Sequence, residues 1–116
     1  MVHFVSQQSR REKEGAQNGN GIVKFRDIFT PEELGERANM CSVITLDPGC
    51  SVGVHAHVDN GEVYCILDGE AVVTEDGAEY TLHPGDAEFC ADGHTHGIEN
   101  RTGETVTFLA VILPNP

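Results

Sequence analysis

Basic residues are scarce over most of this 116-residue chain. Residues 38–116 carry thirteen acidic side chains against one cation, Arg101, whereas six basic and six acidic side chains balance in residues 1–37, so the formal net charge is −12. Nucleic acid binding requires a basic face that neutralises phosphates, and anionic membranes attract basic segments. We therefore expect neither nucleic acid nor a membrane among the partners of this protein.

Long apolar runs, a secretion leader and paired cysteine motifs are also absent. No apolar run approaches the roughly 20 residues of a membrane-spanning helix. The first eight residues contain no basic leader before an apolar stretch, so we expect a cytoplasmic protein. The four cysteines form no Cys-x-x-Cys pair, which argues against a zinc finger or a redox dithiol. Three of them are expected to be small, buried apolar residues in strands: Cys41, Cys65 and Cys90.

Short β-rich runs separated by turn signals dominate the chain from residue 40 onward. We predict strands over residues 40–46, 52–57, 62–68, 70–75, 78–83, 86–90, 95–100 and 104–112. The connections contain Asp-Gly, Asn-Gly and Pro-Gly pairs, which favour tight turns between antiparallel strands. One domain with this many short strands and no intervening helices is an all-β sandwich or a closed barrel such as a jelly roll.

The N-terminal part is expected to be an arm over residues 1–21, attached to a domain over residues 22–116. We predict a short strand over Val2–Val5 and a flexible, polar, glycine-rich connection over residues 6–21. The domain begins with a strand near residues 22–29. One short helix follows over residues 30–37, because Thr30 and Glu33 can form a capping box around Pro31. An N-terminal strand can cover the edge of a partner's sheet, so we expect a homodimer.

Four of the six histidines form two His-x-His pairs, His55-Ala56-His57 and His94-Thr95-His96. Residues i and i+2 of a strand face the same side, so His55 and His57 can present two imidazoles to one point. Glu62 can add an anionic oxygen from the next strand. Imidazole is a ligand for zinc, copper, iron and nickel. A His-x-His pair alone equally describes two histidines on a solvated strand face, so the wider pattern decides.

That pattern resembles the two motifs of the cupin superfamily. The first stretch reads Gly49-x5-His55-x-His57-x4-Glu62-x6-Gly69, and the second reads Gly85-Asp86-x4-Ala91-x-Gly93-x2-His96-x3-Asn100. Ala91 stands where the second motif usually has proline. The resemblance implies a jelly-roll barrel in which four side chains hold one divalent metal ion: His55, His57, Glu62 and His96. It leaves Mn, Fe, Co, Ni and Zn as alternatives, and a metal-free cupin remains the alternative to a metal site.

Further residues are candidates for chemistry near that site. Tyr64 and Ile66 alternate with Glu62 and should share its inward face, and the Tyr64 hydroxyl is a candidate catalytic group. Ala87 and Phe89, like Phe108, are candidates to line an apolar pocket. His94 is a second catalytic candidate as a proton relay, although its position beside a turn favours the rim or solvent. His83 is expected at a surface turn.

The sequence favours a metal-dependent enzyme acting on a small molecule. The barrel supplies only Arg101 as a cation, so we expect a neutral or weakly charged organic ligand rather than a strongly anionic one. A dioxygenase-type oxidoreductase is the preferred reaction, with a lyase or isomerase next. The alternatives are a non-catalytic, metal-dependent binding or sensing module and a purely structural metal site.

Overall fold

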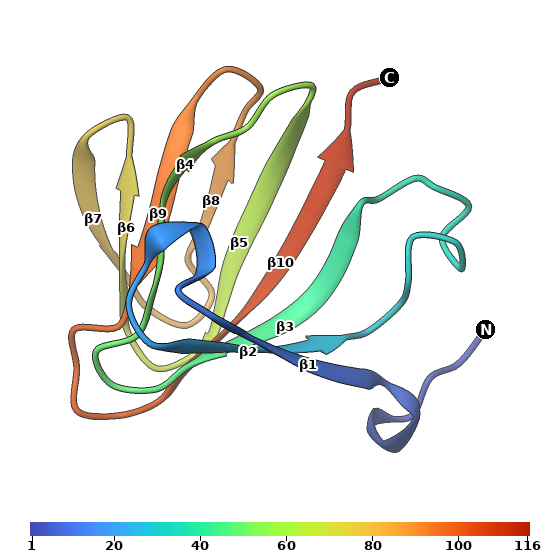
Figure 1. The fold of residues 1–116 in the computed structure, drawn as a ribbon, viewed down its shortest axis with the longest axis horizontal. Helices are drawn as coiled ribbons and strands as arrows, with labels where there is room; N and C mark the ends of the chain where they lie inside the picture. Colours follow the sequence, from blue (N-terminus) through green and yellow to red (C-terminus); the bar gives the residue numbers. More distant parts are fainter.

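The computed structural model describes residues 1–116 and contains ten strands and two short 3-10 helices (Figure 1). The strands are β1 (Ser9–Glu14), β2 (Ile22–Asp27), β3 (Met40–Leu46), β4 (Ser51–Ala56), β5 (Asn60–Asp68), β6 (Ala71–Glu75), β7 (Ala78–Leu82), β8 (Ala87–Cys90), β9 (Thr95–Glu99) and β10 (Val106–Pro114). The 3-10 helices are η1 (Val5–Gln7) and η2 (Ala16–Asn18). Neither helix has the length and apolar character needed to span a bilayer.

The strands form two antiparallel sheets that face each other across the core. One sheet has the order β1-β2-β3-β10-β5-β8 and the other β4-β9-β6-β7 (Figure 1). Strand β10 lies between β3 and β5, far from both in sequence, which closes the larger sheet around the interior. The arrangement confirms the predicted all-β jelly roll.

Alternation along the strands separates the core from the outer surface. In β3, Ser42, Ile44 and Leu46 are buried and point inward, while the residues between them are half-buried. The predicted inward positions of Tyr64 and Ile66 are confirmed, and Phe108 is buried with them, each being no more than 1% exposed. The ring of Phe108 packs edge-on against Tyr64 at 5.0 Å between centroids. These side chains form the floor of the interior.

The outer face of β3, β5 and β10 in the larger sheet is mostly apolar. Its outward-pointing side chains include Cys41, Val43, Val63, Cys65, Leu67, Leu109, Val111 and Leu113, together with Thr45 and Thr107. The expected burial of cysteine is therefore confirmed for Cys90, whereas Cys41 and Cys65 are half-buried on this face. Phe89 is 54% exposed because it pairs with the outward-pointing Val63.

The prediction of a flexible connection over residues 6–21 is wrong. Residues Ser9–Glu14 form β1, which pairs with β2 along its whole length and so forms the edge of the larger sheet. Helix η2 then packs against β4, and the approach is so close that a Cβ on Gly53 would lie 2.1 Å from the carbonyl oxygen of Gln17. Backbone hydrogen bonds to β2 order this segment although its side chains are polar. Composition alone therefore led to the wrong prediction of a flexible connection.

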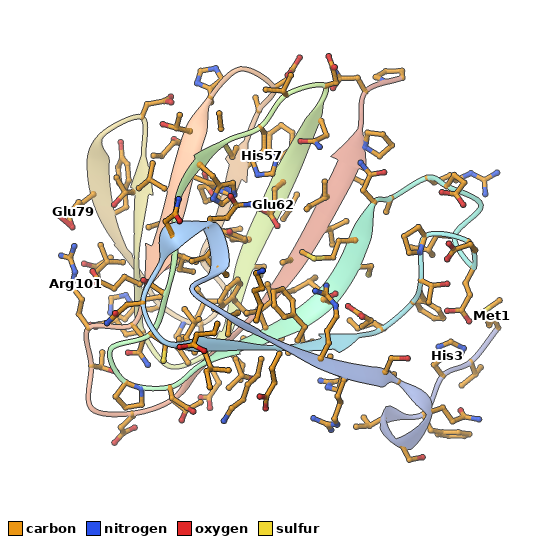
Figure 2. All side chains as sticks on the ribbon, viewed as in Figure 1. Met1, His3, His57, Glu62, Glu79 and Arg101 are labelled. Carbon is orange, nitrogen blue, oxygen red and sulfur yellow. The ribbon has the colours of Figure 1, made fainter.

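The predicted strand over Val2–Val5 is also absent, because residues 1–4 have no regular structure. His3 instead holds the N-terminal residues against other parts of the same chain through two side-chain contacts. Its Nδ1 atom lies 2.9 Å from the carbonyl oxygen of Ile28, and its Nε2 atom lies 2.9 Å from Glu33 Oε2. Figure 2 places His3 beside Met1, far from His57 and Glu62.

The predicted short helix over residues 30–37 forms only turns. The capping contacts are present, since Thr30 N–H donates to Glu33 Oε1 at 2.8 Å and Glu33 N–H donates to Thr30 Oγ1 at 3.2 Å. However, Gly35 and Glu36 adopt positive φ values of 62° and 60°. A right-handed helix cannot continue through two left-handed residues, so the segment ends after a single turn.

Candidate metal centre

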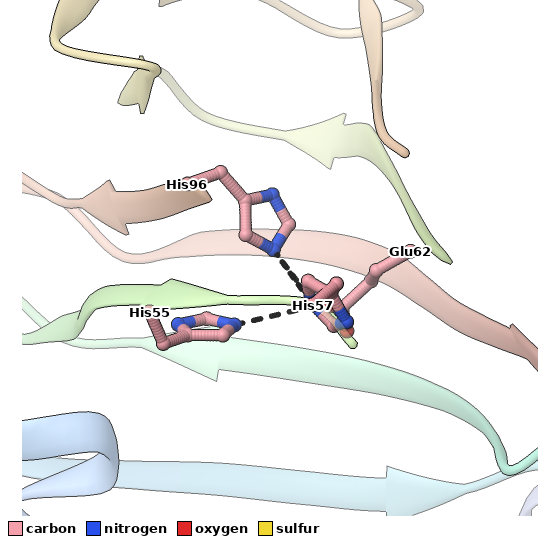
Figure 3. Close-up of side chains that lie close together, drawn as sticks. All are labelled: His55, His57, Glu62 and His96. Atoms are coloured by element: carbon pink, nitrogen blue, oxygen red, sulfur yellow. Dashed lines mark hydrogen bonds and ion pairs between the residues drawn. The ribbon is translucent and has the colours of Figure 1, made fainter. Parts of the chain in front are cut away.

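Four side chains from three neighbouring segments converge inside the barrel (Figure 3). Glu62 Oε1 lies 3.1 Å from His57 Nε2, 3.0 Å from His96 Nε2 and 3.8 Å from His55 Nε2. One potential ligand atom from each of the four residues lies within 4.8 Å of every other, so a single metal ion can be held among them. The structure thus brings together the full set that the sequence motifs predicted.

The sheet register explains why these residues meet. His55 on β4 is paired with His96 on β9, so both imidazoles point to the same inner side. Glu62 on β5 comes from the opposite sheet, and His57 follows the end of β4. The His57 N–H donates to the carbonyl oxygen of His94 at 3.1 Å, which ties the β4–β5 connection to the start of β9.

Each imidazole is oriented by a contact at its other nitrogen. The Nδ1 atoms of His55, His57 and His96 lie 2.7 Å from Gly53 O, 2.6 Å from Asn60 Oδ1 and 2.8 Å from Glu88 Oε1, respectively. Each of these oxygens accepts a hydrogen bond from an Nδ1–H, which leaves the Nε2 lone pair directed at the centre. Such contacts fix the tautomer of metal-binding histidines.

Sequence reasoning missed Asn60 and Glu88. A signal for Asn60 was available, because it precedes Glu62 by two residues on β5 and therefore shares its face. No comparable signal existed for Glu88. It reaches His96 only because the two sheets close on each other in the folded chain.

Burial and charge in this cluster favour a bound cation. His57, Glu62 and His96 are 6%, 3% and 0% exposed. Burial by itself would raise the pKa of Glu62, but the contacts with His55 and His96 and the charges of His96 and His57 lower it to about 2. Burial would lower the pKa of His96, but the carboxylates of Glu62 and Glu88 raise it to about 9. Without a metal, this site therefore holds a buried carboxylate–imidazolium pair.

The donor set fits a divalent metal ion. The Nε2 atoms of His57 and His96 face each other at 3.1 Å, an arrangement that needs either a proton or a cation between two nitrogen lone pairs. Three imidazole nitrogens and one carboxylate oxygen suit the first-row transition metals and zinc. The chemistry of these residues agrees with the metal expected from the sequence, without distinguishing among the ions.

The two catalytic candidates lie in different surroundings. Tyr64 is 1% exposed and stacks on the His96 ring at 4.4 Å between centroids. Burial and the negative charges of Glu62 and Glu88 raise its pKa well above the ordinary value, so the phenol stays neutral. The His94 side chain is 55% exposed and lies outside the cluster, with Nδ1 at 2.6 Å from Asp76 Oδ2. His83 is exposed, as expected, and contacts Glu70.

A cavity of about 620 Å³ opens beside the cluster and is lined by His55, His57, Glu62 and Tyr64. Residues of β1 also line it, among them Arg11, Glu12 and Lys13. The sequence argument that only Arg101 could supply positive charge is therefore wrong, because the N-terminal segment folds over the cavity. Arg101 itself lies at the far edge of the molecule, paired with Glu79 and Glu99 (Figure 2).

The two cations of β1 that line the cavity differ in their contacts with the rest of the protein. Arg11 donates from Nε and Nη2 to Asp27 at 3.0 and 3.2 Å, and its guanidinium lies over the Phe25 ring at 3.9 Å. These contacts hold Arg11 in place and leave Nη1 without a protein acceptor. Lys13 points to the same side of β1 as Arg11, and no carboxylate of the protein pairs with it.

Comparisons with known proteins agree with this architecture. A family model described as "Cupin domain" matches residues 42–112. The "Oxalate-binding protein" of Thermotoga maritima is 36% identical over 95 residues, covering 82% of this chain and 78% of that protein. A crystal structure titled as a predicted oxalate decarboxylase, also from Thermotoga maritima, has a TM-score of 0.94 at 32% identity and covers 98% of this chain and 99% of that one.

A more distant match shares the fold alone. The crystal structure of a cupin-superfamily sugar phosphate isomerase from Silicibacter pomeroyi has a TM-score of 0.80 at 22% identity. The match covers 100% of this chain and 77% of the other.

Proposed function

This chain belongs to the cupin family, and on that premise we propose that it is a metal-dependent binding protein for a small organic dianion of the oxalate class. His55, His57, Glu62 and His96 would hold one divalent ion. The anion would bind at that ion from the adjoining cavity, with Arg11 and Lys13 beside it. The name of the Thermotoga maritima relative supports this ligand class, since that protein is called oxalate-binding.

The observation that carries the proposal is the placement of cations over the metal cluster. Arg11 and Lys13 line the same cavity as His55, His57 and Glu62, although the protein as a whole has a net charge of −12. Guanidinium and ammonium groups recognise carboxylates, and an arginine already fixed on one carboxylate loses little entropy on meeting another. A neutral ligand would have no need of these cations.

The charge of the side chains that face the cavity favours an anion, and a bound metal strengthens that preference. Arg11 and Lys13 face the cavity together with Glu62, whereas Glu12 alternates with them and points to the other side of β1, so the formal charge is +1 with neutral histidines. A divalent ion raises that charge to +3. Affinity for the anion should therefore depend on prior metal loading.

Each group in the cavity has a distinct part in binding. A bound divalent ion would act as a Lewis acid toward carboxylate oxygens. Glu88, Asn60 and the Gly53 carbonyl keep the imidazoles oriented, as their contacts with the three Nδ1 atoms indicate. Tyr64 closes the back of the site as a neutral, buried ring. The open cavity favours ligand binding over a metal that only stiffens the barrel.

The dioxygenase-type reaction expected from the sequence remains a prediction. In the cavity lining, the titratable groups other than the cluster residues are Glu12, Lys13 and Tyr64, together with the permanently charged Arg11. Glu12 and Lys13 belong to β1 and not to the cluster, and Tyr64, which lies at the cluster, is held neutral by its raised pKa. None of these groups is therefore suited to proton transfer at the cluster. Binding is therefore the function that the site supports best, and oxygen consumption by the iron-loaded protein tests for turnover.

The proposal is tested by calorimetric titration of oxalate into protein loaded with Mn²⁺. We expect saturable binding that disappears when the metal is removed with a chelator. Lys13→Ala should weaken oxalate binding by roughly tenfold, the usual effect of losing one charge-assisted contact. Lys24→Ala is the matched control, because Lys24 lies on the neighbouring strand outside the cavity and pairs with Asp47.

Three results would contradict the proposal. The first is equal oxalate binding with and without metal, and the second is no oxalate binding to the loaded protein. The third is the same loss of affinity in the Lys13→Ala and Lys24→Ala variants, which would mean that oxalate binding depends only on the overall charge of the protein. Acetamide, a neutral oxygen ligand of similar size, serves as the comparison and should not compete with oxalate.

A further inference from the structure

A second cavity, of about 400 Å³, lies on the opposite side of His96 from the first. Its lining residues come from β6 and β7 of the smaller sheet and from β8 of the larger sheet. Its apolar walls include Val73, Tyr80 and Leu82, and its charged residues are Glu75 and Glu88. It shares no lining residue with the cavity over the metal cluster.

Glu88 brings an unsatisfied carboxylate oxygen to this cavity. Its side chain is 9% exposed, and Oε1 accepts the hydrogen bond from His96 Nδ1 at 2.8 Å. The second oxygen, Oε2, is buried and has no hydrogen-bond partner, the only such side-chain atom in the protein. A buried carboxylate oxygen without a partner costs free energy, so an external donor at this point would be stabilising.

A second carboxylate reinforces the demand for positive charge. Glu75 points inward from β6, in register with His96 on β9, and also lines the cavity. Both carboxylates therefore face the same cavity, and no lysine or arginine lines it.

The walls indicate what kind of cation fits. Tyr80 is paired with the buried Val73, so its ring faces the cavity, and it is 53% exposed, unusually high for a large apolar side chain that borders a cavity. A bare metal ion needs about six oxygen ligands and gains nothing from apolar walls, whereas the cavity offers two carboxylates and space for several non-hydrogen atoms. Aromatic faces attract organic ammonium groups, and apolar walls accept their carbon atoms.

We propose that this cavity is a second ligand site, which binds a small organic ammonium compound. The ammonium group lies against Glu75 and the free oxygen of Glu88, and its alkyl part packs on Tyr80 and Leu82. The site is independent of the anion site, because the two cavities have different linings and opposite charge requirements. Its failure would leave the proposed binding of oxalate unaffected.

The test is titration of the ¹⁵N-labelled full chain with choline, followed by amide chemical shifts. We expect saturating shifts confined to residues 73–75, 80–82 and 87–90. The neutral isostere 3,3-dimethylbutan-1-ol has the same shape without the charge and should bind at least roughly tenfold more weakly, the difference expected for a partly desolvated ion pair with cation–π contact.

Matched variants assign the effect to the cavity. Glu75→Gln keeps the size of the side chain, contacts none of the four cluster residues through its carboxyl group, and should weaken choline binding roughly tenfold. Glu79→Gln, on the neighbouring strand and paired with the surface residue Arg101, should leave it unchanged. Tyr80→Leu provides a second, exposed change that should weaken binding even if Glu75→Gln were poorly folded.

Several outcomes would overturn the proposal. They are equal binding of choline and its neutral isostere, shifts spread over surface acids throughout the protein, and native choline affinity in both Glu75→Gln and Tyr80→Leu. Displacement of choline by an equimolar amount of Ca²⁺ would also overturn it, because that result would assign the two carboxylates to an inorganic ion.

Discussion

Replacing Glu88 by alanine removes the carboxylate that accepts the Nδ1–H hydrogen bond of His96. The His96 ring would keep its stacking contact with Tyr64 at 4.4 Å, but its tautomer and the basicity of Nε2 would no longer be fixed. The prediction concerns metal affinity, because Glu88 does not contact the centre of the cluster. The Glu88 variant therefore tests how much the orientation of His96 contributes to metal affinity, without removing any of the four residues that would contact the metal.

The magnitude follows from the geometry of that contact. A hydrogen bond to a charged, nearly buried acceptor contributes roughly 1.5–3 kcal/mol, and loss of such a partner lowers metal affinity roughly 10- to 100-fold. For Glu88→Ala we expect a loss within that range. Glu88→Gln keeps an acceptor oxygen without its charge and should lose only about threefold to tenfold.

Competition with a chromophoric chelator for Co²⁺ measures both affinities. His94→Ala is the control, because His94 belongs to the same His-x-His pair but is exposed and contacts Asp76. We expect the control to bind Co²⁺ as the native chain does. If Glu88→Ala, shown to be folded by circular dichroism, retained native affinity, the assigned role of Glu88 would be wrong. Equal losses in the Glu88 and His94 variants would refute it as well.

Two further predictions concern pH and assembly. In metal-free protein, the pKa of Glu62 is lowered to about 2, so its stabilisation is present above its ordinary value of 4.5 and lost as pH falls. The pKa of His96 is raised to about 9, so its stabilisation is present below 6.5 and lost as pH rises. Thermal unfolding in chelator should therefore give the highest Tm between about pH 4.5 and 6.5, and a Tm unchanged from pH 6.5 to 9 would contradict this. The homodimer expected from the sequence remains a proposal, for which the mostly apolar outer face of β3, β5 and β10 provides a surface. Light scattering should find that Leu109→Glu on this face is monomeric, while Val54→Glu on the outer face of the smaller sheet stays dimeric; two equal masses would exclude this face.

Local patterns in the sequence were sufficient for the strands and for the cluster. Alternation located the inward face of β5, because a strand side chain has only two directions to point. The resemblance to two cupin motifs gave the four residues that meet at the centre. The helix expected after Thr30 failed because two consecutive left-handed residues, Gly35 and Glu36, stop it after one turn.

Long-range packing decided what surrounds the cluster. The segment over residues 9–18 looked flexible because it is polar, yet pairing with β2 places Arg11 and Lys13 in the lining of the cavity, which is the basis for proposing an anionic ligand. Composition could not reveal this, because backbone pairing is available to almost any sequence beside an open strand edge.

The sequence by itself determined that this chain is a barrel of short antiparallel strands with three imidazoles and a carboxylate facing inward. The strands follow from short β-rich runs and turn signals, and the set of four inward residues follows from the resemblance to the cupin motifs. Only the tertiary structure decided that Glu88 supports His96, that β1 covers the cavity with cations, and that residues of β6, β7 and β8 line a second acidic cavity. These features join residues from separate strands, and closure of the two sheets sets the distances between them.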